Sequence, residues 1–177
     1  GDVSGKFMEP MQGLESAVSI SNEQKLSSLL SLRYGLRYSL FNRMGPGHEV
    51  TYDEDNSPLT SEPFGDWETM SIHSVLEPRI AMTYLLNDRS SLKLSYNRMA
   101  QYIRLMNLGM VRNAFDVWMP TTNNIEPIIA DQVAVGYFKN FADNAIEFSV
   151  EAYYKSYQNQ SDFEDGLHNY FVSNLEA

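Results

Sequence analysis

The chain of 177 residues contains no cysteine, which excludes a disulfide framework, a thiolate metal site and a cysteine nucleophile. Basic residues are also few: 13 Lys and Arg stand against 23 Asp and Glu, for a formal net charge of -10. Such a charge repels the phosphate backbone of nucleic acid, so we expect no nucleic-acid partner. The sequence has no apolar run of about 18 residues, so it predicts no transmembrane helix.

The chain is rich in aromatic residues, with 11 Tyr, 9 Phe and 2 Trp. Apolar residues make up 43% of the sequence and charged residues 20%, which is a composition typical of folded rather than disordered chains. The length suits one domain of ordinary size.

Apolar residues recur at every second position. From Leu30 to Leu40 the even positions hold Leu or Tyr and the odd positions hold Ser, Arg or Gly. The run from Ala145 to Lys155 alternates in the same way. A strand places alternate side chains on opposite faces, whereas a helix would scatter Arg33 and Arg37 among the leucines. Shorter alternating segments occur at 14–20, 79–86, 92–97 and 132–137, so the sequence predicts an all-β fold of about six strands.

The connections between these segments alternate in length. Those at 25–28, 87–91 and 140–144 are short and polar, as in tight hairpins, while 42–70, 103–130 and the residues from 158 onward are long. In an antiparallel up-and-down meander, alternate connections lie at the same end of the sheet. We therefore expect the short turns at one end and the long loops at the other.

Two architectures use this alternation. A soluble barrel or sandwich buries its apolar face, and nothing obliges its loops to be short at one end only. An outer-membrane barrel turns its apolar face to lipid, pairs short periplasmic turns with long extracellular loops, and has strands of about 9 to 11 residues with aromatic girdles. The expected difference in loop length between the two ends of the sheet favours the membrane barrel. The charged residues of the alternating segments fall on the polar faces, which either architecture predicts: Glu15, Arg33, Arg37, Arg79, Lys93, Glu147, Glu151 and Lys155.

Several motifs resemble the barrel region of TonB-dependent receptors from Bacteroidetes outer membranes. They are LRYGLRYSLFN at 32–42, LEPR at 76–79, SSLKLSYNRMAQYI at 90–103, WMPTTNNIEPIIADQ at 118–132, GYFKNF at 136–141 and SVEAYYKSYQNQSDFEDG at 149–166. Each is weak alone, but together they follow the family's order and spacing from about residue 14 to residue 177. The resemblance implies that residues 1–177 form a partial β-barrel segment without the plug domain, located in the cell outer membrane.

The same resemblance implies a function. Receptors of this type import a nutrient ligand through a barrel of about 22 strands, using energy that the TonB complex transmits through the plug domain. The implied partners are outer-membrane lipid, the TonB complex acting through the absent plug, and an extracellular ligand whose identity stays open. A piece of about six strands leaves two edges and an apolar face bare, so we expect the excised fragment to self-associate or to fold its loops over that face.

Aromatic residues in the long connections are the candidate ligand-binding residues. Their rings can stack on a carbohydrate or peptide, and the candidates are Tyr52, Trp67, Phe115 and Trp118. The alternative is that large loops use such residues for small cores of their own, and we favour that alternative. A soluble antiparallel-β carbohydrate-binding or adhesion module, with function carried by these loops, is the second functional hypothesis.

Catalytic and metal chemistry have no candidate constellation in the sequence. His48, His73 and His168 lie far apart in or beside connections, where we expect solvated side chains. The acidic stretch at 53–56 lacks the spacing of a calcium loop, so we expect it to be solvated too. Glu147 and Glu151 would lie about 13 Å apart along a strand, too far for a glycosidase pair. We expect no enzymatic activity, metal or cofactor.

Overall fold

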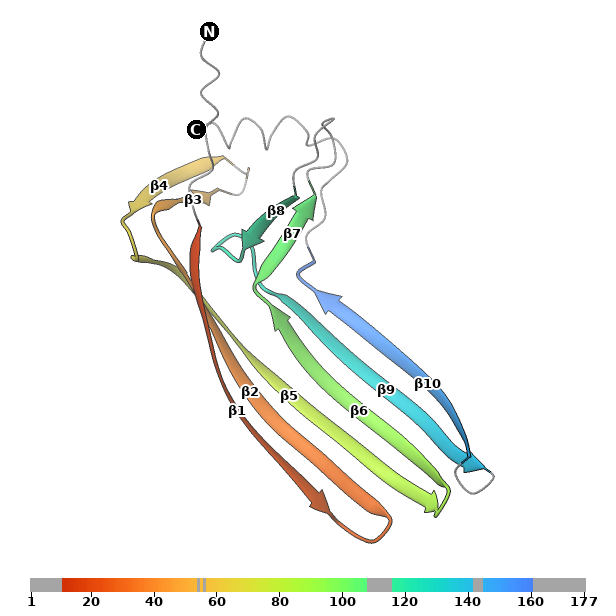
Figure 1. Ribbon diagram of the computed structural model, residues 1–177. Coiled ribbons are helices and arrows are strands. Elements are labelled where there is room, and N and C mark those ends of the chain that lie inside the picture. The colour runs from red at the N-terminus through yellow and green to blue at the C-terminus, as the bar shows by residue number, and fades with distance from the viewer. Residues whose placement is uncertain (1–10, 54, 56, 108–115, 142–144, 161–177) are drawn as a thin grey trace.

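A computed structural model describes residues 11–53, 55, 57–107, 116–141 and 145–160. Six of the strands form one antiparallel sheet (Figure 1). In spatial order they are β1 (Gln12–Lys25), β2 (Leu30–Met44), β5 (Thr69–Asn87), β6 (Ser90–Gln101), β9 (Ile128–Phe141) and β10 (Ile146–Gln158). Within this sheet each strand pairs with the next one along the chain, which confirms the predicted antiparallel meander of about six strands.

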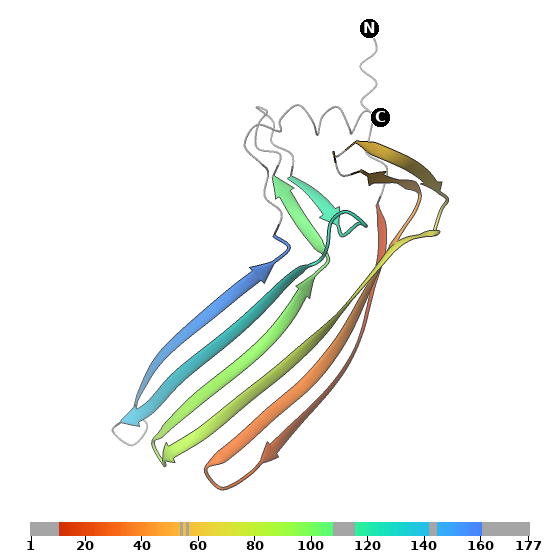
Figure 2. The same cartoon turned by 180° about the vertical axis from the view of Figure 1, so that it is seen from behind.

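The connections of the sheet alternate as predicted. The strand ends that the short connections join lie together at one end of the sheet, and those that the long connections join lie at the other (Figures 1 and 2). The short connections follow β1, β5 and β9. Two hairpins occupy the long connections, so the expectation of plain loops at 42–70 and 103–130 was wrong. One hairpin is β3 (Gly47–Tyr52) with β4 (Pro58–Phe64), and the other is β7 (Ile103–Asn107) with β8 (Asp116–Pro120).

The two hairpins escaped prediction for physical reasons. Strand β4 contains Pro58 and Pro63, which normally argue against a strand. The β3–β4 pair is a separate two-stranded sheet, so each strand has a free edge where a missing N–H costs no ladder bond. Strands β7 and β8 have five residues each, too short for alternation to be diagnostic.

The register of the sheet aligns the apolar positions of neighbouring strands. One row across β2, β5, β6, β9 and β10 consists of Leu32, Met82, Leu94, Val135 and Ala152. The next row consists of Tyr34, Ile80, Tyr96, Val133 and Tyr154. We call the side of the sheet that carries these rows the apolar face and the opposite side the polar face. Strand β1 adds Val18 and Ile20 to the apolar face.

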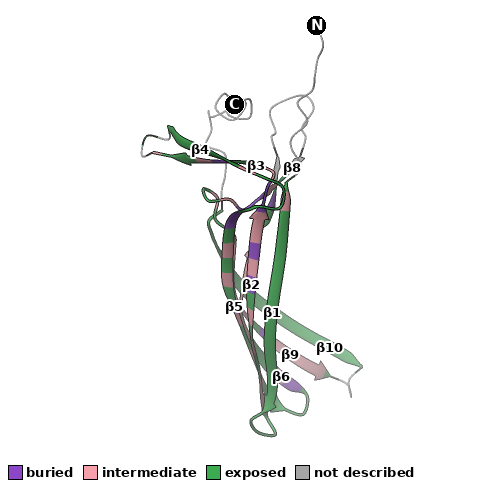
Figure 3. Cartoon of the chain, turned by 90° about the vertical axis from the view of Figure 1, so that its left-hand side faces the viewer, coloured by how far each residue is buried: buried purple, intermediate pink, exposed green. Residues whose placement is uncertain are grey.

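Most large side chains on the apolar face are exposed. Ile20 is 76% exposed, Val150 56% and Leu94 46%. The buried apolar residues lie instead where the hairpins meet the sheet, and they include Phe41, Met44, Met70 and Tyr102 (Figure 3). Phe41 and Tyr102 stack with ring centroids 5.4 Å apart. The hydrophobic core of the described residues is therefore small, and the leucines of the alternating strands contribute little to it.

No helix among the described residues has the length and apolar character needed to cross a membrane.

Candidate functional site

The apolar face carries many of the exposed large hydrophobic side chains among the described residues. Soluble proteins rarely expose contiguous apolar patches of more than a few hundred Å². Here two complete rows of apolar side chains follow one another across five strands, and further exposed residues continue them along β5 and β10. A continuous surface of this kind is suited to contact with an apolar medium or an apolar partner.

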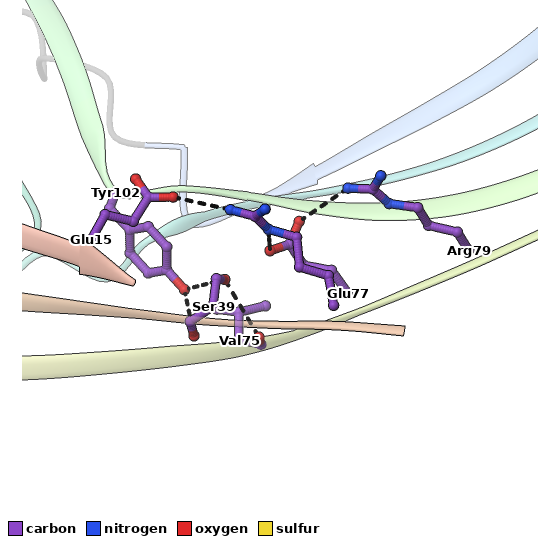
Figure 4. Close-up of polar contacts among 7 residues, drawn as sticks. Glu15, Ser39, Val75, Glu77, Arg79 and Tyr102 are labelled. Atoms are coloured by element: carbon purple, nitrogen blue, oxygen red, sulfur yellow. Dashed lines mark hydrogen bonds and ion pairs between the residues drawn. The ribbon is translucent and has the colours of Figure 1, made fainter. Parts of the chain in front are cut away.

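The polar face carries a network of charged side chains (Figure 4). Glu77 on β5 is almost fully buried, and its carboxylate accepts a hydrogen bond from Arg37 Nε at 3.3 Å. Arg37 also reaches Glu15 on β1 at 3.4 Å, and Arg79 approaches Glu77 at 4.0 Å. The network links β1, β2 and β5 and neutralises the carboxylate that the fold has removed from water.

Tyr102 packs on the polar face beside this network. Its hydroxyl lies 2.8 Å from Ser39 Oγ and donates to the Ser39 carbonyl at 3.2 Å. Burial raises the pKa of the Tyr102 phenol, and the hydrogen bond with Ser39 partly offsets that rise. Tyr102 follows β6 directly and Ser39 belongs to β2, so these contacts hold the β7–β8 hairpin over the sheet.

Polar contacts order the chain around the hairpins. Thr121 is fully buried, and both its backbone N–H and its hydroxyl donate to the Tyr102 carbonyl. Arg104 donates to the Glu126 carbonyl at 2.7 Å, and burial lowers the pKa of its guanidinium. Asn124 donates to the Val50 carbonyl at 2.8 Å and thereby connects the loop after β8 to the β3–β4 hairpin. The two hairpins thus form a connected layer at the long-loop end of the sheet.

Three of the four candidate ligand-binding residues lie in this hairpin layer. Tyr52 ends β3, Trp67 lies in the turn between β4 and β5, and Trp118 lies in β8. Phe115 lies outside the described residues. The structure does not bring the three together, because the register places Tyr52 and Trp67 at opposite ends of the β3–β4 hairpin and Trp118 in the other hairpin.

The exposure of these three aromatic residues corrects the interpretation of them as loop cores. Trp67 is 70% exposed, Trp118 63% and Tyr52 42%. Rings that face solvent to this extent contribute little packing inside a loop. They remain available for stacking on a ligand.

Trp67 also has an unusual backbone. Its φ of 63° lies in the left-handed region, which is costly for a bulky side chain. The turn is held by Trp67 N–H donating to the Gly45 carbonyl and Gly45 N–H donating to the Glu68 carbonyl. Glycine or asparagine would fit this conformation with less strain, so the presence of an exposed tryptophan points to a role other than stability.

Among the described residues, the histidines and the acidic stretch offer no metal site. The described residues contain no group of three His, Asp or Glu side chains that could hold a metal ion. Asp53 instead accepts hydrogen bonds from the backbone N–H groups of Asp55 and Ser57. The expectation of a solvated loop histidine was wrong for His73, because β5 starts earlier than predicted and carries His73 half-buried beside Phe41. His168 lies outside the described residues.

The sequence reasoning placed the charged residues of the alternating segments correctly but missed others. All eight named residues lie on the polar face. Arg98, Asp131 and Lys139, however, lie on the apolar face, beyond the segments whose alternation was evident. Extending the period of two by one step in β6 and β9 would have found them.

Comparisons of the chain with protein-family models, with curated proteins and with solved structures find no match.

Proposed function

We propose that this chain is part of the wall of an outer-membrane β-barrel, in a TonB-dependent receptor that imports a nutrient ligand. The observation that carries the proposal is the exposed apolar face, with most of the charged residues of the same sheet on its opposite side. In a membrane barrel the apolar face contacts lipid and the polar face lines the lumen. The short turns then lie on the periplasmic side, and the hairpin layer is extracellular.

The lengths of the strands support this assignment. Five of the six strands have between 13 and 19 residues. A transmembrane strand needs about 9 to 11 residues to cross the hydrocarbon core at a tilt of about 45°. Most strands of this sheet therefore exceed the membrane requirement and also exceed the mean of about 5 to 6 residues in soluble proteins.

The partners follow from the proposal. Outer-membrane lipid covers the apolar face, an extracellular ligand contacts the hairpin layer, and the TonB complex acts through a plug domain outside this sequence. The proposal also predicts that the isolated 177-residue chain self-associates without lipid, because the described residues leave the apolar face exposed and the two edge strands, β1 and β10, unpaired on one side. Light scattering of the isolated chain tests this, and a monomer with the face open to water would contradict it.

The principal experiment uses the full-length protein in its own cell. We expect the protein to fractionate with the outer membrane, and we expect deletion of its gene to abolish growth on one nutrient among candidate siderophores, oligosaccharides, cobalamin-like compounds and peptides. Recovery of the mature protein in a soluble fraction would refute the proposal.

A matched pair of substitutions tests the orientation of the sheet. Leu94 and Ser95 are neighbours in β6 that point to opposite faces. Leu94→Arg would place a charge in hydrocarbon at a cost of about 2 to 4 kcal/mol, whereas Ser95→Arg would place it in the lumen. We expect Leu94→Arg to reduce the amount of receptor assembled in the outer membrane and Ser95→Arg to leave it near wild type. Equal effects of the two variants would contradict the proposed orientation.

A soluble carbohydrate-binding or adhesion module is the second candidate function. The exposed rings of Trp67 and Trp118 favour it, because such rings are typical of sugar-binding surfaces. This module would need another layer over the apolar face, since leucine rows open to water promote aggregation. Recovery of the mature protein from a soluble or extracellular fraction as a stable monomer would favour it.

A further inference from the structure

The apolar face is interrupted by a polar cluster at its hairpin end. Arg98 of β6 and Asp131 of β9 are register partners on this face, one step beyond Tyr96 and Val133. Arg98 Nε donates to Asp131 Oδ1 at 2.8 Å, and Arg98 Nη2 donates to Oδ2 at 3.0 Å. The guanidinium and the carboxylate therefore meet through two parallel hydrogen bonds, the strongest geometry for such a pair.

Two neutral groups complete the same cluster. The Tyr96 hydroxyl donates to Asp131 Oδ1 at 2.7 Å, and Gln158 Nε2 of β10 donates to Oδ2 at 3.4 Å. We call these four residues, Tyr96, Arg98, Asp131 and Gln158, the outward polar cluster. Its two charges cancel, and the Arg98 side chain remains 38% exposed. A neutral, internally bonded cluster with a partly exposed guanidinium is suited to the interface between hydrocarbon and headgroups.

A second charged residue lies at the other end of the apolar stretch of β9, near the short turns. Lys139 lies on the apolar face, with Ser90 and Phe148 as its register partners. Its ammonium group stands 4.7 Å from the centre of the Phe141 ring. A lysine beside exposed aromatic rings is the usual composition of a membrane interface, where the ammonium group meets lipid phosphates.

The distance between the two charged positions matches a bilayer. Asp131 and Lys139 are eight residues apart in β9, with Val133, Val135 and Tyr137 between them on the same face. At about 3.3 Å per residue this separation is roughly 26 Å along the strand, or ~20 Å along the membrane normal for a tilt of about 40°. The charged side chains at the two ends can each extend a few Å further along the membrane normal, away from the midplane. The distance between the charged groups then becomes about 25 Å, the height of the apolar band in such barrels.

We propose that the outward polar cluster and Lys139 are the two lipid-headgroup contacts of this wall and that together they fix its depth in the membrane. The cluster meets the headgroup region on the hairpin side, and Lys139 meets phosphate groups on the short-turn side. Val135 then lies near the bilayer midplane. The inference rests on the proposed membrane location and goes beyond it by assigning the boundary to particular residues.

The test is a depth measurement on the full-length protein in phospholipid bilayers. Nitroxide labels are attached to single cysteines introduced at Ile129, Val135 and Phe141, all on the apolar face, and at Ala134 on the polar face as a control. We expect the Val135 label to be the most accessible to oxygen and the least accessible to a water-soluble nickel chelate. The Ile129 and Phe141 labels should reach the chelate, because they lie beyond the two boundaries.

The outcomes separate the two proposals. A Val135 label without lipid contact would overturn the membrane assignment and the depth assignment together. A Val135 label in lipid, with the Ile129 or Phe141 label equally deep, would leave the membrane assignment in place and overturn the depth assignment. The expected profile, with a maximum at Val135 and both flanking labels in the headgroup region, supports both.

A paired substitution gives a second, independent measurement. Changing Arg98 and Asp131 together to leucine extends the apolar stretch by one step, about 5 Å along the membrane normal, at its hairpin end only. Because Lys139 keeps the other boundary, the centre of the stretch moves by half of that length, so the Val135 label should move by about 2.5 Å relative to the midplane. The control changes Arg33 and Glu23 together to leucine, which removes an ion pair of the polar face with N–O distance 2.6 Å. We expect no shift from this control, and a shift of equal size in the two double variants would refute the boundary role of the cluster.

Discussion

The ring of Tyr102 lies flat on the ring of Phe41, with an interplanar angle of 9°. Tyr102 lies between β6 and β7, and Phe41 lies near the hairpin end of β2, so this stack joins the hairpin layer to the polar face. We expect Tyr102→Ala to destabilise the full-length protein by about 3 to 5 kcal/mol, the usual cost of removing a buried aromatic side chain. Denaturant unfolding of the purified protein measures this. Tyr153→Ala, at a tyrosine 73% exposed, should cost far less.

The Tyr102 hydroxyl makes the same contact sensitive to alkaline pH. Burial raises the pKa of the folded phenol above its unfolded value of about 10, so the folded state holds the proton more tightly. This stabilisation is complete below the unfolded pKa and is lost as the pH rises through the folded pKa. We expect the stability of wild type relative to Tyr102→Phe to fall above about pH 10. A difference that stays constant up to pH 12 would contradict this expectation.

The six strands were predictable because alternation depends only on which side chains meet water and which do not. Leu30 to Leu40 follows the period of two without exception, and β2 begins at Leu30 as the pattern predicts. The strands also extend beyond the evident alternation. β5, for instance, contains Pro78, Ser74 and His73, which carry no apolar signal and are held by the ladder with β2.

The hairpin layer was less predictable because long-range contacts determine it. Tyr102 is buried only because β6 ends where the polar face of β2 carries Phe41, which lies 61 positions earlier in the chain. Nothing in the local sequence distinguishes this tyrosine from Tyr153, which is exposed. Similarly, Trp67 and Trp118 could equally have formed loop cores, and only the fold shows that their rings face solvent.

The buried carboxylate of Glu77 should be important for stability. Its side chain is 6% exposed and lies between Arg37 and Arg79. Glu77→Gln removes the negative charge and leaves both guanidinium groups without their shared partner, so we expect a loss of about 1 to 3 kcal/mol in the free energy of unfolding. The matched control is Glu23→Gln, which breaks the exposed pair with Arg33 and should cost less than about 1 kcal/mol. Equal losses would show that burial of Glu77 contributes nothing.

Trp118 offers a test of ligand recognition. Its ring is 63% exposed in β8, opposite Leu105 of β7. If the protein imports a nutrient as proposed and this ring stacks on it, Trp118→Ala should raise the nutrient concentration for half-maximal growth about ten-fold, equivalent to ~1.4 kcal/mol of binding. Leu105→Ala removes an exposed apolar side chain from the same hairpin without removing a ring, and we expect near-normal growth. Wild-type growth of the Trp118→Ala strain would exclude this residue from the site.

Replacing Trp67 should change stability and nutrient-dependent growth in opposite directions. A tryptophan with φ of 63° is strained, and asparagine adopts that conformation more readily. Trp67→Asn should therefore raise the free energy of unfolding by about 1 kcal/mol, while loss of the exposed ring should weaken growth on the nutrient. Trp67→Phe keeps an aromatic ring and most of the strain, so it should retain uptake without the gain in stability. A Trp67→Asn variant that is more stable and supports normal growth would show that the strain serves no role in the proposed ligand binding.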